Sequence, residues 1–178
     1  MMRRSAVLLV AGVLNISAAE AGERIYEMPG YGGVLILPVP TGWVEELRRP
    51  SDEGPPAINF HGAGREDFRV FILPFPGAGA DVAGMVRGAA RGIAPLAAEE
   101  QIEVKPLGGD VRGYWFGYTD RSLAGTVPPE GEYIYTVQGA ALVGDLALTF
   151  TVLTNDRRSA AIAAALRMVR AARYHGGS

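Results

Sequence analysis

Short apolar runs separated by turn residues follow one another between residues 34 and 73. Residues 34–39 form a continuous apolar run closed by residues 40–42, which is typical of a strand buried on both faces and followed by a turn. Residues 43–47 predict a second, short strand, and the proline-containing residues 50–56 predict a loop. Residues 57–61 and 67–73 predict two more strands, because the first alternates and the second is rich in aromatic and β-branched side chains.

The pattern becomes helical between residues 80 and 100. Apolar residues recur there at intervals of three and four, at Val82, Met85, Val86, Ala89, Ala90 and Ile93. This spacing predicts an amphipathic helix, and Asp81 is placed to cap its first turn. Interior glycines and Pro95 weaken the helix, so we expect it to bend or break near Ala94.

The rest of the chain predicts more strands and a closing helix. Residues 101–105, 111–118 and 132–143 predict strands, the last of which continues through a Gly144-Asp145 hairpin into residues 146–153. A second amphipathic pattern predicts a helix over residues 156–174, with Thr154 or Asn155 as its N-cap. The order of strands, helix, strands and helix favours an α+β fold in which helices flank an antiparallel sheet.

The first 21 residues have the pattern of an export signal. Two arginines stand near the start, residues 6–16 are apolar except for Asn15, and small residues follow. These are the parts of a secretory signal peptide, with cleavage expected before Gly22 or, as an alternative, before Glu20. The apolar run is too short to span a bilayer as a helix, so an uncleaved anchor is the lesser alternative. We therefore expect one periplasmic or secreted domain, residues 22–178, with no membrane span after cleavage.

Composition excludes several classes of function. The 17 basic and 19 acidic side chains give a formal charge of −2, so no basic field exists to hold a nucleic acid. The chain has no cysteine and two histidines, which excludes disulfides, thiol nucleophiles and lipid-modified cysteines and disfavours the usual zinc sites. We expect no metal and no cofactor.

A glycine-rich segment, residues 74–81, joins a predicted strand to a predicted helix, where a phosphate-binding loop can sit. The third glycine of a dinucleotide motif falls on Val82, however, no lysine follows, and Asp81 would repel a phosphate. We interpret the segment as an ordinary capped connection.

His61 is the one candidate for acid–base chemistry. Glu66 and Asp67 follow it closely, and a histidine oriented by a carboxylate can act as a general base toward water. No serine lies in a Gly-x-Ser-x-Gly motif. The competing interpretation is a histidine at a strand end with a purely structural role.

Aromatic residues gather on two consecutive predicted strands. The set consists of Tyr114, Phe116, Tyr118, Tyr133 and Tyr135. The first three share one face of their strand and the last two share a face of the next, so the strands can form an aromatic ladder. With Arg112 and Arg121 nearby, a groove lined by this ladder would suit a planar or anionic ligand. Core packing under a helix is the alternative.

The proline-rich loops 50–56 and 120–131 are the predicted partner-contact surfaces.

The opening strand, residues 35–40, and the turn Thr41-Gly42-Trp43 precede strands, one helix, more strands and a closing helix. This arrangement, over roughly residues 34–174, resembles the PsbP-like superfamily. That superfamily includes extrinsic photosystem proteins, DcrB-like bacterial envelope proteins and a nuclear transport factor that binds a small GTPase. The resemblance implies a PsbP-like layered sandwich and a role in binding or assembly rather than catalysis, and it supplies no catalytic residues to carry over.

Together these patterns predict an exported, non-enzymatic binding or assembly-accessory domain of the bacterial cell envelope, with an envelope protein or a small ligand as its partner. The alternative is a small extracytoplasmic hydrolase that uses His61 with Asp67 or Glu66. A third hypothesis is an inert module that packs on a larger assembly.

Overall fold

The computed structural model describes residues 21–49, 54–64 and 67–176. Residues 1–20 of the predicted signal peptide lie outside this part of the chain. The strands and helices of the described chain are β1 (Ala21–Glu27), β2 (Gly33–Pro40), β3 (Val44–Arg48), β4 (Ala57–His61), β5 (Phe68–Pro76), α1 (Val82–Ile93), the 3-10 helix η1 (Ala94–Leu96), β6 (Lys105–Pro106), β7 (Arg112–Thr119), β8 (Tyr135–Val143), β9 (Leu146–Thr154), α2 (Ala160–Arg170) and β10 (Arg173–Gly176).

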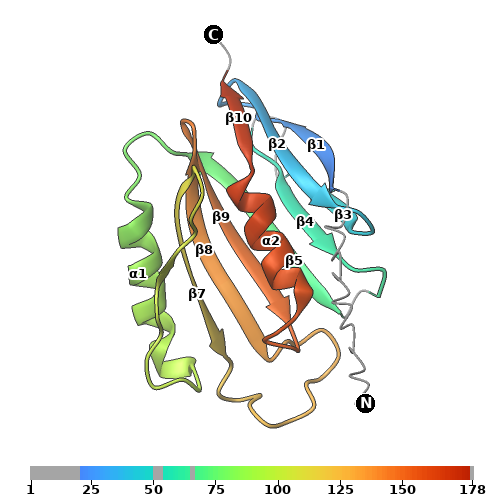
Figure 1. Ribbon diagram of the computed structural model, residues 1–178, viewed down its shortest axis with the longest axis vertical. Coiled ribbons are helices and arrows are strands. Elements are labelled where there is room, and N and C mark those ends of the chain that lie inside the picture. The colour runs from blue at the N-terminus through green and yellow to red at the C-terminus, as the bar shows by residue number, and fades with distance from the viewer. Residues whose placement is uncertain (1–20, 50–53, 65–66, 177–178) are drawn as a thin grey trace, which may run out of the picture.

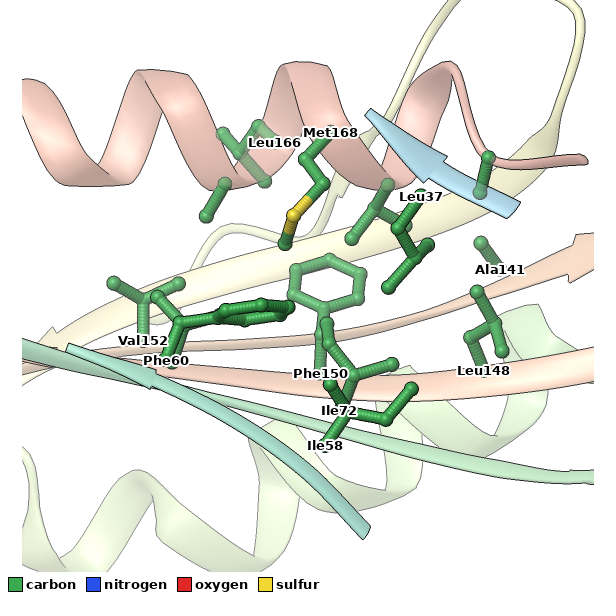
Figure 2. Packing of buried hydrophobic residues seen from close by; sticks show 14 of the residues in the cluster. Leu37, Ile58, Phe60, Ile72, Ala141, Leu148, Phe150, Val152, Leu166 and Met168 are labelled. Carbon is green, nitrogen blue, oxygen red and sulfur yellow. The ribbon is translucent and has the colours of Figure 1, made fainter. Parts of the chain in front are cut away.

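The strands form two antiparallel sheets (Figure 1). The larger sheet has seven strands in the order β3-β4-β5-β9-β8-β7-β6, and the smaller has three in the order β1-β2-β10. The smaller sheet and α2 pack on one face of the larger sheet, while α1 packs against β7 and β8 on the other face (Figure 2). No helix among the described residues is long and apolar enough to cross a membrane.

The predicted fold class, an α+β sandwich in which helices flank one antiparallel sheet, is wrong. Strands make up 45% of the described residues and helices 17%, and a second sheet covers part of the face that the prediction gave to a helix. The prediction missed β1 because its charged residues are exposed and Tyr26 is its only buried residue. It missed β10 because the apolar spacing of α2 continues past the last residue of the helix. The helix ends at Arg170, not at residue 174. Its N-cap is Ser159 rather than Thr154 or Asn155.

The main core lies between the two sheets and under α2. Leu35, Leu37 and Val39 alternate along β2 toward this core, while their neighbours on the strand are only partly buried. β2 therefore buries one face rather than the two that its apolar run predicted. Figure 2 shows Leu37 beside Phe150 of β9 and Met168 of α2, with Phe60 and Ile58 of β4 completing the layer.

Helix α1 confirms its predicted start and end. It begins after Asp81, whose carboxylate accepts a hydrogen bond from the Gly84 N–H at 2.9 Å, and it passes into η1 at Ala94. Its buried side chains, Val82, Val86 and Ala90, pack on Phe116 and Ala140 of the large sheet and form a second, smaller core.

Removal of the Asp81 cap is expected to destabilise the protein. Asp81→Ala leaves the Gly84 N–H without its partner, which costs about 1 kcal/mol of unfolding free energy. Asp81→Asn keeps an acceptor oxygen and is expected to stay within a few tenths of a kcal/mol of wild type. Urea denaturation measures both. Equal stability of the alanine and asparagine variants would show that the cap contributes nothing.

The glycine-rich segment before α1 has a structural explanation. Gly77 lies so close to the Leu146–Ala147 backbone that a Cβ there would stand 2.7 Å from the Ala147 nitrogen, and its own N–H donates to the Asp145 carbonyl at 2.9 Å. Gly79 has a φ of +74°, a conformation that favours glycine. The Asp81 carboxylate occupies the N-terminus of α1, where a phosphate would bind. The glycines instead let the chain between β5 and α1 pass close to the backbone of β9.

A buried tyrosine joins the two sheets. The Tyr26 hydroxyl of β1 donates a hydrogen bond to Glu45 Oε2 of β3 at 2.7 Å. Burial raises the pKa of Tyr26 far above its ordinary value, and the hydrogen bond and negative charge of Glu45 act in the same direction, while Arg24 opposes them. The folded protein therefore holds this phenolic proton more tightly than the unfolded chain does.

The raised pKa of Tyr26 predicts a loss of stability at alkaline pH. Its contribution is complete below the unfolded pKa of 10.0 and is lost as the pH rises above that value, because the unfolded chain then gives up the proton first. Tyr26→Phe is expected to lose less unfolding free energy than wild type between about pH 9 and pH 11. Denaturant titrations across this range test the prediction, and identical slopes for the two proteins would contradict it.

Candidate functional site at the edge of β7

The predicted aromatic set is divided between the two faces of the large sheet. Tyr114, Phe116 and Tyr118 face α1, where Phe116 is fully buried and the two tyrosines pack around it. The register pairs Thr119 with Tyr135, so Tyr135 lies on the opposite face, with Trp115. Tyr133 is buried just before β8. The structure thus packs the first three rings under a helix and places Tyr135 in a different environment.

The two predicted arginines lie at opposite ends of β7. Arg112 opens the strand and lines a hollow with Asp81 and Tyr114 at the start of α1. Arg121 follows the other end, where its Nε donates to the Ala97 carbonyl at 3.0 Å. The strand between them is more than about 20 Å long at 3.3 Å per residue, so the arginines do not converge on one ligand.

His61 is a buried residue at the end of β4. Its Nδ1–H donates to the Gly62 carbonyl at 2.6 Å, and its Nε2 lies 3.7 Å from Glu46 Oε1 of β3. Only 8% of its side chain is exposed. Glu46 thus places a carboxylate beside the ring, the Asp67 carboxylate lies by Gly62 and Gly64, and Glu66 lies outside the described residues. These contacts give His61 a structural role, since they link β4 to β3. The hydrolase hypothesis stays a prediction.

A hollow opens between β7 and the segment that follows η1. Ala97 in this segment pairs with Asp120, just after β7, and β6 pairs with β7 through Lys105–Trp115 and Pro106–Tyr114. Eight steps along the chain separate Ala97 from Lys105, but only five separate Trp115 from Asp120. The surplus residues cannot lie flat against β7, so residues 99–104 bow away from this strand, and Ile102 and Val104 pack against the smaller core under α1. The space that results has a volume of about 170 Å³.

Aromatic rings and polar side chains line this space, which we call the edge hollow. Its lining consists of Glu99, Gln101, Glu103, Lys105, Trp115, Gly117, Tyr135 and Arg157. Trp115 and Tyr135 are both partly exposed and flank Gly117. A Cβ at Gly117 would overlap the Tyr135 hydroxyl, so only glycine lets that ring lie across the strand. The glycine is therefore part of how the hollow is built.

Glu99 is held rigidly at one end of the edge hollow. Its two carboxylate oxygens accept hydrogen bonds from the Thr119 N–H and the Thr119 hydroxyl, each at 2.8 Å. Partial burial acts to raise the pKa of Glu99, but the hydrogen bonds from Thr119 and the charge of Arg157 outweigh it, and the pKa lies below its usual value. The carboxylate is therefore ionised and fixed in place before any ligand arrives.

Cations stand over both aromatic rings. Lys105 Nζ lies 5.6 Å from the centre of the Trp115 ring and 3.2 Å from Glu103 Oε2, and the Arg157 guanidinium lies 5.9 Å from the centre of the Tyr135 ring. Burial raises the pKa of Tyr135; Arg157 and Lys105 act against this and Glu99 supports it. The hydroxyl of Tyr135 therefore keeps its proton at neutral pH and can donate a hydrogen bond.

Sequence reasoning found Tyr135 but missed the rest of the edge hollow. One signal was available: residues 99, 101, 103 and 105 are polar and alternate with apolar Ile102 and Val104, which places the polar four on one face of an extended segment. Trp115 also stands on the opposite face from Tyr114 and Phe116. Nothing local indicated Arg157, which arrives from the connection between β9 and α2.

Among the described residues, no group of three or more histidine, aspartate or glutamate side chains is arranged to hold a metal ion. A scan against models of known protein families gives no match to this chain, and a search of curated proteins gives none either. The resemblance to the PsbP-like superfamily accordingly stays a prediction.

Proposed function

We propose that this chain is an exported, non-enzymatic binding domain of the bacterial cell envelope, and that the edge hollow is its ligand site. The observation that carries the proposal is the bowed segment, which leaves two partly exposed aromatic rings beside fixed polar groups. Binding sites characteristically combine an apolar surface with a few well-placed polar groups that set orientation. The expected signal peptide supports export, and the burial of His61 favours binding over hydrolysis.

Thermal unfolding of the purified protein tests binding. Neutral, acidic, basic and zwitterionic small molecules are added in turn, and a ligand present at about one hundred times its Kd stabilises the fold by about 2.7 kcal/mol. For a chain of this size that corresponds to a rise in Tm of about 5–10 °C. Trp115→Ala is expected to reduce the rise by about half or more. Met85→Ala, on α1 at the opposite face, is the matched control and is expected to keep it.

If none of these classes of compound raises the Tm, the binding function is wrong. If a compound raises the Tm equally in wild type and Trp115→Ala, the site lies elsewhere. Export is tested separately by cell fractionation with N-terminal sequencing, which is expected to find a chain that begins at Gly22 outside the cytoplasm. Recovery of the uncleaved chain in the cytoplasm would contradict the envelope location.

A further inference from the structure

The edge hollow has the donors and acceptors of a site for hydroxyl groups. Acceptors come from the carboxylates of Glu99 and Glu103, and donors come from Arg157, Lys105 and the protonated hydroxyl of Tyr135. The side-chain amide of Gln101 supplies one of each kind. A hydroxyl group both donates and accepts, so a ligand with several hydroxyls can use both kinds of partner at once.

The backbone of β7 adds a further donor and acceptor. The Gly113 and Thr119 carbonyls accept hydrogen bonds from Leu107 and Ala98 on the edge side of the strand. The N–H and C=O groups of an antiparallel strand alternate in direction with a period of two, so those of Gly117 also point toward this edge. They do so where residues 99–104 bow away, and they therefore face the hollow.

The charges around the edge hollow balance. Glu99 and Glu103 supply two negative charges, and Lys105 and Arg157 supply two positive ones. Glu103 and Lys105 already form an ion pair at 3.2 Å, and the charges of Arg157 and Glu99 act on each other. A ligand with a net charge would gain little from this arrangement, because an opposing charge stands beside each attractive one. The site suits a neutral polar ligand.

The two rings and the volume limit the ligand further. Trp115 and Tyr135 offer aromatic surface against which the C–H face of a saturated ring can pack, while its hydroxyls reach the polar rim. A volume of about 170 Å³ is below the roughly 300 Å³ at which drug-sized pockets begin, so it holds one ring rather than a long molecule. Because the hollow lies at an open sheet edge, a further ring can extend into solvent.

We infer that the edge hollow binds a neutral saccharide, with one sugar ring seated on Trp115 and Tyr135. The inference rests on the proposed binding function and names its ligand class. Glu99, Arg157 and the Gly117 backbone hold the hydroxyl groups of this ring. Lys105 and Glu103 form the rim through their ion pair.

Isothermal titration calorimetry on the full chain tests the ligand class. The titrants are neutral monosaccharides and disaccharides, the matching uronic acids and amino sugars, and free amino acids as zwitterions. Neutral sugars are expected to bind, and the uronic acid and amino sugar of the same ring are expected to bind no more tightly. Trp115→Ala is expected to weaken binding about tenfold or more through the loss of ring packing, whereas Met85→Ala leaves it unchanged.

A second variant keeps the test valid if Trp115→Ala unfolds. Glu103→Gln removes one charge at the exposed rim and breaks the ion pair with Lys105, leaving the site with a net positive charge. This variant is expected to gain affinity for the uronic acid relative to the neutral sugar. The same preference in Glu103→Gln as in wild type would contradict the balance of charges on which the inference rests.

The possible results separate the saccharide inference from the binding function. Binding of a charged or zwitterionic compound at least tenfold tighter than any neutral sugar, with loss in Trp115→Ala, overturns the saccharide class and keeps the binding site. Sugar binding that Trp115→Ala leaves intact overturns the site. No heat from any titrant overturns the saccharide class alone, because the binding function is tested by the wider set of compounds in the Tm measurement.

Discussion

Leu37→Ala is expected to cost about 2–5 kcal/mol of unfolding free energy, the range for removing a fully buried leucine side chain. Leu37 is 0% exposed and reaches from β2 of the small sheet into the core shared with β4, β9 and α2 (Figure 2). The substitution leaves a cavity where the two sheets meet. Urea denaturation monitored by circular dichroism measures the loss.

Ile25→Thr is the matched control for Leu37→Ala. Ile25 lies on the neighbouring strand β1 of the same small sheet, but it is 66% exposed, so its replacement by another β-branched residue is expected to change stability by no more than about 0.5 kcal/mol. Equal effects of the two substitutions would show that the small sheet does not close the core and that the fold described above is wrong on this point.

Gly139→Ala is expected to destabilise the protein by about 3 kcal/mol, at the upper end of the usual cost of overpacking. Gly139 lies in β8, where a Cβ would overlap the Phe150 ring and stand 2.5 Å from the Tyr114 carbonyl oxygen. The ring can turn, but the Tyr114 backbone belongs to the β7–β8 ladder and moves only if that ladder distorts. Thermal and urea unfolding measure the effect.

Gly88→Ala is expected to raise the stability of the protein, the opposite of the effect of Gly139→Ala. Gly88 lies inside α1, and a Cβ there would meet nothing within 4 Å. Alanine is favoured over glycine in a helix interior, so a gain of about 0.5–1 kcal/mol is expected. If Gly139→Ala is as stable as wild type, the β7–β8–β9 packing is not as described.

The local pattern of apolar residues predicted those elements that bury a regular row of side chains. β4 was predicted with its observed bounds, and α1 was predicted together with its cap and its break at Ala94, because each has a full apolar period and a clear end signal. The small sheet was not predicted, because β1 has Tyr26 as its one buried residue and β10 has no buried residue. Such strands are held by pairing with β2, which a single stretch of sequence does not reveal.

The edge hollow was predictable only in part for a similar reason. Tyr135 was found because aromatic residues on strands stand out in a sequence. The division of the rings between two faces depends on the β7–β8 register, which pairs Thr119 with Tyr135. The bowed segment depends on where residues 97 and 105 pair with β7. Both are long-range properties, whereas apolar periodicity reports only local ones.

Fluorescence of Trp115 tests the central claim, that the edge hollow is the ligand site. The chain has two tryptophans, and Trp43→Phe keeps an aromatic ring beside Phe60 and Phe68 while leaving Trp115 as the sole emitter. Titration of this variant with the neutral saccharide that binds by calorimetry is expected to shift the emission to shorter wavelength and to protect it from acrylamide, with the same Kd as the calorimetric titration. Unchanged emission at saturating saccharide would contradict the claim.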